Sequence, residues 1–431
     1  MLYDHLSVSS NGHLLIDGAD TVSLAKEFGT PLYVLSEDRI RENCRKYTKA
    51  FRECFPEGSM LLYAGKALCF RGIYPIIGSE GFGADVVSAG EIFTALSAGF
   101  PAEKLYFHGT NKTDEEIRFA LDRHVGTFVV DNFAELEALN AEAERRGIVQ
   151  DILLRVTVGI DPHTLAAINT GKVDSQFGTP IETGAAIKIL EKALSMQHLN
   201  VRGFHSHIGS MIFEADPFLD QIDILLDFSA AAKAKLQYVP EILNLGGGFG
   251  VPYVESDPKV DIEENIRKIA LHLDAGLEKY ALPPIRILME PGRSIVADAG
   301  VTLYTAGGLK TIEGYRSYVT VDGGMTDNPR YALYKSAYTV LSAARMNEPA
   351  DFCCTLAGRC CESGDRIAED IFLPKPSRGD VLAVLTTGAY NYSMSSNYNR
   401  IPRPALVMLK NGQPYLAVRR ETYEDLIARE G

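Results

Sequence analysis

Lys66 is a candidate for covalent chemistry, because of both its amine side chain and its position in the sequence. It ends the segment YAGK, which follows a short apolar run, so the pattern predicts a lysine at the carboxyl end of a buried strand. An ammonium is costly to bury unless it is paired or neutralised, and a buried lysine with a lowered pKa readily forms an imine with a carbonyl compound. The alternative is a lysine at the rim of the fold with its amine in water.

Glu290 opens the segment EPGR at the end of another apolar run. A carboxylate close to Lys66 could hold a proton on the ring nitrogen of a cofactor such as pyridoxal phosphate, which would make that ring a strong electron sink. The alternative is a structural ion pair between Glu290 and Lys66 or Arg293.

Glycines follow a third apolar run, in the segment NLGGGFG that contains Gly246, Gly247 and Gly248. Backbone N–H groups without side chains can approach a phosphate closely. A run of glycines alone usually marks only a turn, and this one does not match the glycine-rich loops that bind nucleotides.

His205 and His207 in HSHIGS stand two residues apart, so on a regular strand they point to the same face. Two such histidines could bind zinc, but the sequence offers no clear third ligand at the usual spacing. A flat imidazole stacked on a pyridine ring suits the neighbouring residues better, and we predict no metal.

The elements that must position these residues read as repeated βα units from about Glu37 to Arg293. The expected strands cover residues 60–66, 81–87, 104–109, 127–132, 152–158, 201–207, 241–247 and 285–291. Expected helices include residues 89–99, 113–123, 133–147 and 185–196. Eight strands alternating with helices predict an α/β fold with a closed TIM-type (β/α)8 barrel.

Polar residues stand at or just after most of these strand ends, and in such a barrel the carboxyl ends of the strands form the catalytic face. They include Lys66, Asp85, Ser88, His108, Asn111, Asn132, Arg155, His205, His207 and Glu290. We expect one shared cavity rather than independent turns.

Beyond Arg293 the helical periods disappear, and short β-prone pieces follow one another between Gly, Pro and Asp turns. These pieces cover residues 294–310, 316–324, 352–358, 381–388 and 403–410. We therefore expect a barrel over residues 36–293 and a mostly β domain over 294–431. The opening segment, residues 1–35, contains the strand-like pieces HLLIDG and TPLYVLS, and we expect it to pair with the β domain.

Charge and cysteine content exclude several classes of partner. The 43 lysines and arginines against 56 acidic residues give a net charge of −13, which argues against nucleic acid and anionic membranes. No secretory signal or membrane-spanning apolar run is present.

The seven cysteines form no C-x-x-C pair, so we expect a reducing, cytoplasmic setting. The pairs Cys353–Cys354 and Cys360–Cys361 read at this point as buried strand residues.

Eight segments of the chain together resemble a known family. They are YAGK, DVVSAGE, FHGTNK, HSHIGS, NLGGGFG, EPGR, CCESGD and GAYNYSMSSNYN, in this order over nearly the whole chain. Each is weak alone, but in register they closely resemble the diaminopimelate decarboxylases, which are pyridoxal-phosphate enzymes of the alanine-racemase-like fold.

The resemblance implies that pyridoxal 5′-phosphate is the cofactor, that Lys66 forms the internal aldimine, that His207 stacks on the ring and that Glu290 pairs with its nitrogen. Further cofactor contacts are implied for Asp85, His108, Gly246, Gly247, Gly248, Gly292, Arg293 and Tyr390. The implied reaction decarboxylates meso-2,6-diaminopimelate to L-lysine and carbon dioxide, the last step of lysine biosynthesis.

The resemblance also implies a head-to-tail homodimer with shared active sites, in which Cys361 and Glu362 act in the partner's site. Cys361 would then donate a proton to the carbanion left after carbon dioxide departs, which replaces the earlier interpretation of this cysteine. Two departures from the family pattern, residues 67–70 (ALCF) and Met211, put only fine substrate contacts in doubt.

The far end of the substrate distinguishes diaminopimelate from simpler diamines, because it carries both a carboxylate and an ammonium. The resemblance implies that Arg293 and Arg330, with Tyr334 and Tyr390, bind the distal carboxylate. Glu362 would bind the distal ammonium. Alternatives are a decarboxylase of ornithine, arginine or carboxynorspermidine, a catalytically silent relative that binds the cofactor, and a metal-dependent barrel hydrolase.

Overall fold

The computed structural model describes residues 3–160 and 174–431, which divide into two compact units. One unit comprises Cys44–Gly250 and Lys259–Gly292, and we call it the barrel unit. The other comprises Met1–Asn43, Val251–Pro258 and Arg293–Gly431, and we call it the β unit. Each unit therefore contains segments that are far apart in the sequence.

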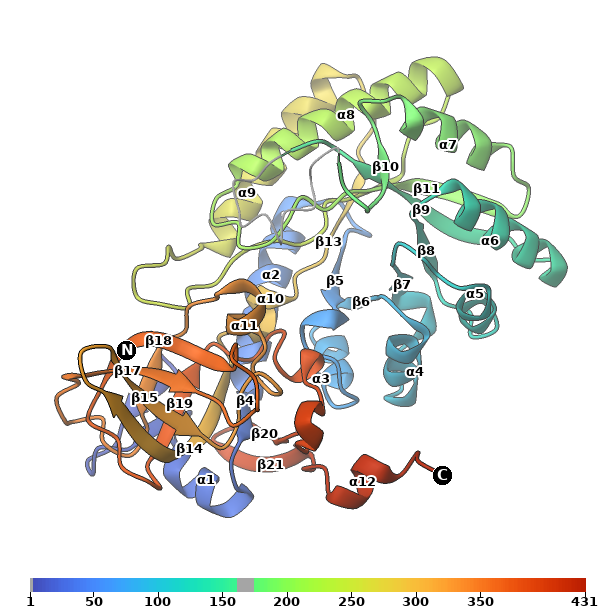
Figure 1. Cartoon of the computed structure of the whole chain (residues 1–431). Helices are drawn as coiled ribbons and strands as arrows, with labels where there is room; N and C mark the ends of the chain where they lie inside the picture. Colours follow the sequence, from blue (N-terminus) through green and yellow to red (C-terminus); the bar gives the residue numbers. More distant parts are fainter. Residues whose placement is uncertain (1–2, 161–173) are drawn as a thin grey trace. The chain divides into compact units, whose positions relative to one another are not determined.

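The barrel unit is a closed ring of eight parallel strands, as predicted (Figure 1). They are β5 (Met60–Ala64), β6 (Gly83–Val86), β7 (Leu105–Phe107), β8 (Thr127–Val130), β9 (Gln150–Thr157), β11 (Leu199–His205), β12 (Ile242–Asn244) and β13 (Arg286–Met289). Each of the eight lies within or close to a range expected from the sequence. The last strand, β13, pairs with the first, β5, and closes the ring. A short strand, β10 (Thr179–Pro180), adds to β9.

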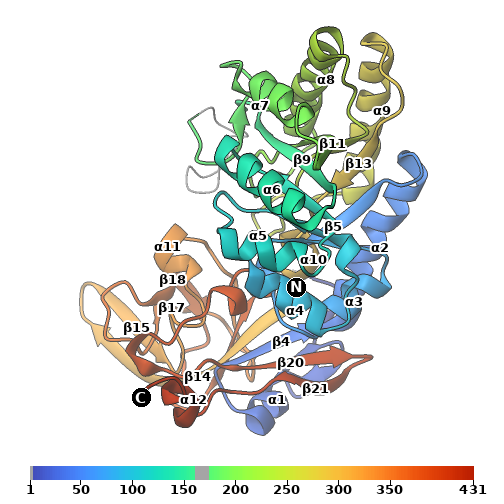
Figure 2. The ribbon, with the colours of Figure 1, turned by 90° about the vertical axis from the view of Figure 1, so that its right-hand side faces the viewer.

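Helices alternate with the strands of the ring, and Figure 2 shows α5, α6, α7, α8 and α9 outside it. The helices are α3 (Ile73–Ser79), α4 (Ala89–Ser97), α5 (Asp114–Leu121), α6 (Phe133–Arg146), α7 (Ala185–Leu194), α8 (Asp216–Leu236) and α9 (Ile262–Lys279). The helix α2 (Glu37–Cys54) has residues in both units.

Apolar side chains fill the ring because its strands are covered on both faces and read as continuous hydrophobic runs. One interior cluster takes a single residue from each of six strands: Leu62, Tyr106, Val129, Leu153, Ile242 and Leu288. The interior is a packed core, so polar chemistry is confined to the strand ends.

Two of the polar strand-end residues serve local structure. Ser88 caps α4 by accepting a hydrogen bond from the Glu91 N–H, and Asn132 caps α6 in the same way through the Glu135 N–H. Such caps satisfy the first N–H groups of a helix. The expectation that polar strand ends belong to one shared cavity is therefore too broad for these two residues.

The β unit contains a nine-stranded sheet with the order β18-β17-β15-β14-β4-β20-β21, in which β19 pairs with β14 and β16. Its strands are β4 (Leu32–Ser36), β14 (Gly300–Ile312), β15 (Arg316–Val321), β16 (Val340–Ser342), β17 (Phe352–Ala357), β18 (Arg366–Leu373), β19 (Val381–Leu385), β20 (Ala405–Lys410) and β21 (Gln413–Val418). Short helices accompany it: α10 (Arg293–Val296), α11 (Arg330–Tyr334) and α12 (Tyr423–Ile427).

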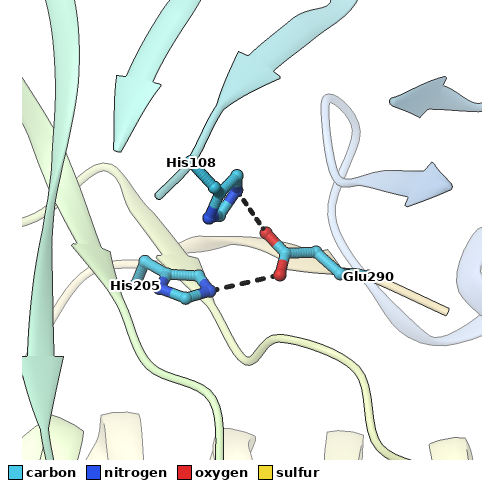
Figure 3. A group of neighbouring side chains, drawn as sticks. All are labelled: His108, His205 and Glu290. Atoms are coloured by element: carbon cyan, nitrogen blue, oxygen red, sulfur yellow. Dashed lines mark hydrogen bonds and ion pairs between the residues drawn. The ribbon is translucent and has the colours of Figure 1, made fainter. Parts of the chain in front are cut away.

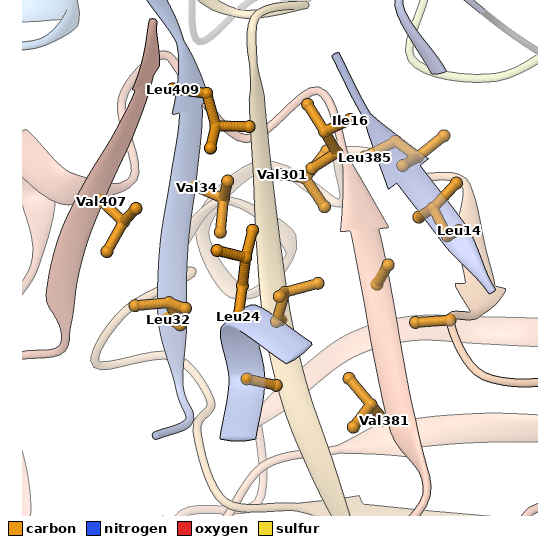
Figure 4. Close-up of a cluster of buried hydrophobic side chains, with 14 of the residues drawn as sticks. Leu14, Ile16, Leu24, Leu32, Val34, Val301, Val381, Leu385, Val407 and Leu409 are labelled. Carbon is orange, nitrogen blue, oxygen red and sulfur yellow. The ribbon is translucent and has the colours of Figure 1, made fainter. Parts of the chain in front are cut away.

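The opening segment joins the β unit, as expected from the sequence. The piece TPLYVLS becomes β4, which lies between β14 and β20. The piece HLLIDG does not join that sheet: it supplies β2 (Leu14–Ile16) of a small sheet with β1 (Leu6–Val8) and β3 (Ala19–Asp20), followed by helix α1 (Thr21–Phe28). Leu14 and Ile16 nevertheless pack into the same core as Leu32 and Val301 (Figure 4).

No helix in the described part of the chain is long and apolar enough to cross a membrane.

Candidate active site

Lys66 lies in a single turn of 3-10 helix (Gly65–Ala67) directly after β5. Its Nζ is 3.4 Å from Oδ2 of Asp85, the buried carboxylate on the neighbouring strand β6. The expectation of a buried lysine is wrong, because the side chain keeps 45% of its exposure. The turn places the amine at the open end of the strand, where another group can reach it, and not inside the barrel.

Glu290 follows β13 and is held by three side chains from other strand ends. Its Oε1 is 2.9 Å from Nε2 of His108 and accepts a hydrogen bond from Asn244 Nδ2 at 2.7 Å. Its Oε2 is 3.2 Å from Nε2 of His205 (Figure 3). His108 also lies 3.8 Å from Asp85, so a chain of polar groups runs from Lys66 to Glu290.

Electrostatics keep Glu290 ionised although it is buried. Burial alone would raise the pKa of Glu290, but attraction and hydrogen bonding from His108 and His205 hold it well below 4.5. Burial also lowers the pKa of His205 to about 4, so this imidazole is neutral at pH 7. A neutral imidazole that donates its Nε2–H matches an ionised carboxylate.

His207 lies just beyond β11 and faces the same group of residues. Burial lowers its pKa well below 6.5, and repulsion from Lys66 and Arg155 adds to this. Its ring lies against the glycine loop, because a Cβ built on Gly246 would be 2.8 Å from His207 Nδ1.

Gly246, Gly247 and Gly248 form a loop that no larger residue could replace. A Cβ on Gly247 would lie 2.1 Å from the backbone oxygen of Glu290, and one on Gly248 would lie 2.8 Å from the Gly209 oxygen. Gly246 and Gly248 also have φ of 69° and 141°, which favour glycine. Gly292 is similarly confined, since its Cβ would lie 2.9 Å from the Cβ of Ala64, two residues before Lys66.

A second cluster of predicted residues forms within the β unit, around the ring of Tyr390. The guanidinium carbons of Arg293 and Arg330 lie 4.7 and 5.5 Å from the centre of this ring. Arg330 also lies 5.2 Å from the ring of Tyr334, one turn along α11. Both arginines are buried, and such planar cations bind carboxylates in two-pronged fashion.

Cys361 and Glu362 lie on the loop between β17 and β18, and both are exposed. The adjacent Cys360 is partly buried, Cys354 is buried and Cys353 is exposed. The interpretation of all four cysteines as buried strand residues therefore holds only for Cys354.

Two side chains in these clusters, Asn244 and Tyr253, were not predicted at the site, and His205 was predicted there without a contact to Glu290. His205 and Asn244 contact Glu290 directly, and both end a buried strand, which is a detectable signal because buried polar groups need partners. The Tyr253 hydroxyl accepts a hydrogen bond from Arg293 Nη1 at 2.6 Å, and nothing in the local sequence indicates it.

Known proteins match the sequence and the fold of this chain. The family model for the pyridoxal-dependent decarboxylases, pyridoxal binding domain, matches residues 37–297. A diaminopimelate decarboxylase of Bacillus subtilis (strain 168) is 43% identical over 419 residues, which cover 97% of this chain and 95% of that protein.

Solved structures agree. A diaminopimelate decarboxylase from M. jannaschii in co-complex with L-lysine has a TM-score of 0.90 at 34% identity and covers 99% of this chain and 98% of its own. A lysine/ornithine decarboxylase from Vibrio vulnificus complexed with putrescine has a TM-score of 0.77 at 25% identity, covering 94% and 100%.

A barrel with an accessible lysine and a buried carboxylate at its strand ends, together with the family match, makes this chain a member of the pyridoxal-dependent decarboxylases. Its similarity to relatives over nearly the full length places it in the diaminopimelate decarboxylase family within that class.

The residues present fit the cofactor of this family, pyridoxal phosphate. Lys66 offers an accessible amine, and the side-chain-free loop at Gly246–Gly248 suits a phosphate. Each carboxylate oxygen can accept two hydrogen bonds. Oε1 of Glu290 accepts from Asn244 and lies 2.9 Å from His108 Nε2, whereas Oε2 accepts from His205 and can still bond a protonated ring nitrogen.

His108, His205 and Glu290 also bring three possible metal-ligand atoms within 4.8 Å of one another. The metal interpretation from the sequence rested on His205 and His207, whereas the structure groups His205 with His108. Both histidines already contact Glu290 directly, His205 through a hydrogen bond and His108 at 2.9 Å, so the three groups partner one another without a metal ion.

The low pKa of His205 predicts a pH dependence of stability. The unfolded chain takes up a proton at this histidine below about pH 6.5 and the folded protein does not until about pH 4, so the free energy of unfolding falls as pH is lowered between these values. Urea unfolding of His205→Asn at pH 7 and at pH 4.5 should show a fall smaller than that of wild type by about 1–3 kcal/mol.

The control is His124→Asn, which changes an exposed histidine of the barrel unit. This variant should lose as much stability as wild type over the same pH range. Equal losses in wild type and His205→Asn would contradict the assignment of a neutral, buried His205.

Proposed function

We propose that the protein is a pyridoxal-phosphate-dependent carboxy-lyase that converts meso-2,6-diaminopimelate into L-lysine and carbon dioxide, the last step of lysine biosynthesis. Relatives that share about two fifths of its sequence over nearly its full length are diaminopimelate decarboxylases. L-Lysine, the product of the proposed reaction, is bound in the M. jannaschii structure.

The observation that carries the substrate assignment is the arginine pair around Tyr390. Among the described residues, Arg330 Nε is buried and has no hydrogen-bond partner. Leaving a buried charged donor unpaired is costly, so such a group is expected to receive an anion. The carboxylate at the far end of diaminopimelate is such an anion, and ornithine has none there.

The cofactor, when bound, supplies an electron-withdrawing ring that accepts the electrons of the breaking bond between the α carbon and its carboxylate. Lys66 would hold it covalently, and Glu290 would keep a proton on its ring nitrogen. The loop at Gly246–Gly248, the backbone at Gly292 and Tyr390 would hold its phosphate, with Asp85 and His108 nearby. His207 would cover the ring face.

The remaining residues act on the substrate. Arg293, Arg330, Tyr334 and Tyr390 would bind the distal carboxylate, and Glu362 would bind the distal ammonium. Cys361 would then give a proton to the α carbon, so that a hydrogen replaces the lost carboxylate. Two arginines beside the ammonium of ornithine would repel it, which disfavours that substrate.

We further propose a homodimer with shared sites, in which one chain provides Cys361 and Glu362 to its partner. Exposure of both residues supports this arrangement. Large apolar side chains are also exposed on two elements that pack together, namely Leu333 on α11 (56%) and Phe372 on β18 (60%). A second chain that covered them would remove this surface from water.

We also propose that the protein acts in the cytoplasm. All seven cysteines are free thiols, which suits a reducing compartment.

The function is tested by turnover. Purified protein with pyridoxal phosphate and meso-diaminopimelate should release carbon dioxide and L-lysine in equal amounts. Lys66→Ala should lower kcat by roughly a thousandfold or more, because it removes the amine that activates the cofactor. Lys188→Ala, which changes an exposed lysine on α7, should keep wild-type activity. Turnover of ornithine or arginine but not of diaminopimelate would contradict the substrate assignment.

Substrate selection is tested at Arg330. Arg330→Gln should lower kcat/KM for meso-diaminopimelate by about 30- to 1000-fold, since two charge-assisted hydrogen bonds are lost. Its kcat/KM for ornithine should stay the same or rise. Arg378→Gln, at an exposed arginine of the β unit, is the control and should change neither value by more than about twofold. An equal loss for both substrates would contradict a role for Arg330 at the distal carboxylate.

A further inference from the structure

The backbone around Cys361 is held unusually firmly for an exposed loop. Loops on a protein surface commonly leave their N–H groups to water. Here two consecutive N–H groups donate to side-chain oxygens. The N–H of Cys360 donates to Asp365, and the N–H of Cys361 donates to Asn399. All four residues lie in the β unit.

Asp365 is the buried anchor of this loop. Its Oδ2 accepts a hydrogen bond from Cys360 N–H at 2.6 Å, and its Oδ1 accepts one from Met325 N–H at 2.6 Å. The carboxylate thereby joins the loop of Cys361 to the segment that leads to Arg330. A side chain at Gly358 would lie 2.3 Å from both carboxylate oxygens, so the glycine makes the space that Asp365 fills.

Asn399 holds the other N–H group. Its Oδ1 accepts the hydrogen bond from Cys361 at 2.7 Å. The residue has φ of 53° and ψ of 21°, a left-handed conformation that asparagine tolerates better than most residues. Its own segment is anchored too, because Glu421 accepts hydrogen bonds from Asn397 Nδ2 and from the N–H of Arg403.

We propose that Asp365 and Asn399 are positioning residues for the proton-donating thiol of Cys361. They act on the backbone, by accepting hydrogen bonds from the N–H groups of Cys361 and of the residue before it. The inference rests on the proposed role of Cys361. A proton must be delivered to one carbon atom, and a displacement of about 1 Å can cost about a hundredfold in rate.

Asn399→Ala tests this directly, because it removes the acceptor of the Cys361 amide. We expect kcat for meso-diaminopimelate to fall about 10- to 100-fold while KM changes by less than about threefold. Asn399→Asp keeps an acceptor oxygen at the same place and should restore kcat to within about threefold of wild type. Arg400→Gln is the matched control, because Arg400 follows Asn399 in the chain and its exposed side chain pairs with Glu430; this variant should keep kcat within about twofold of wild type.

A double substitution separates positioning from a general effect on folding. In a Cys361→Ala background there is no thiol to position, so adding Asn399→Ala should lower kcat no further. Should Asn399→Ala fail to fold, Asp365→Asn takes its place in the same measurements, because it turns one acceptor toward a backbone N–H into a donor.

The outcomes distinguish the inference from the proposed function. If wild type makes no lysine from meso-diaminopimelate, the proposed function fails. If wild type is active but Asn399→Ala matches it, or if its effect adds fully to that of Cys361→Ala, only the positioning role fails.

Discussion

Glu290 carries a negative charge inside the barrel, where burial works against it. Hydrogen bonds from His205 and Asn244 and the close contact with His108 offset that cost, and these residues stand at the ends of three other strands, β11, β12 and β7. The charge is therefore stable only when the ring of strands is closed in this register. Because β13 pairs with β5, the same closure brings Glu290 to the strand that leads into Lys66.

Chemistry is divided between the two units of the chain. The barrel unit carries the lysine, the carboxylate and the glycine loop that suit the cofactor. The β unit carries Arg293, Arg330 and Tyr390, which suit the distal end of the substrate, and the loop of Cys361.

Much of this arrangement could be predicted from the sequence, because parallel barrel strands are buried on both faces and appear as continuous apolar runs. All eight barrel strands were predicted. In the β unit, β16, β18 and β21 were missed, since β16 has three residues, β18 is interrupted by charges and β21 contains a proline. The segment at Ser294–Val296 was read as strand but belongs to helix α10, where local propensity is a weak guide.

Side-chain partners were harder to predict than elements. The exposure of Lys66 depends on a single turn after β5, and the pairing of His205 with Glu290 depends on barrel closure. Both are tertiary features that periodicity does not record. The roles of Cys361 and Glu362 came from family resemblance alone, since an exposed loop cysteine carries no pattern of its own.

We propose that Lys66 holds the cofactor, and reduction of the holoenzyme with borohydride is the direct test of this linkage. Reduction fixes the linkage between the cofactor and its lysine, and peptide mass mapping then locates it. We expect a pyridoxyl group on the peptide that contains Lys66 and on no other. A pyridoxyl group on a different lysine, with Lys66 unmodified, would contradict it.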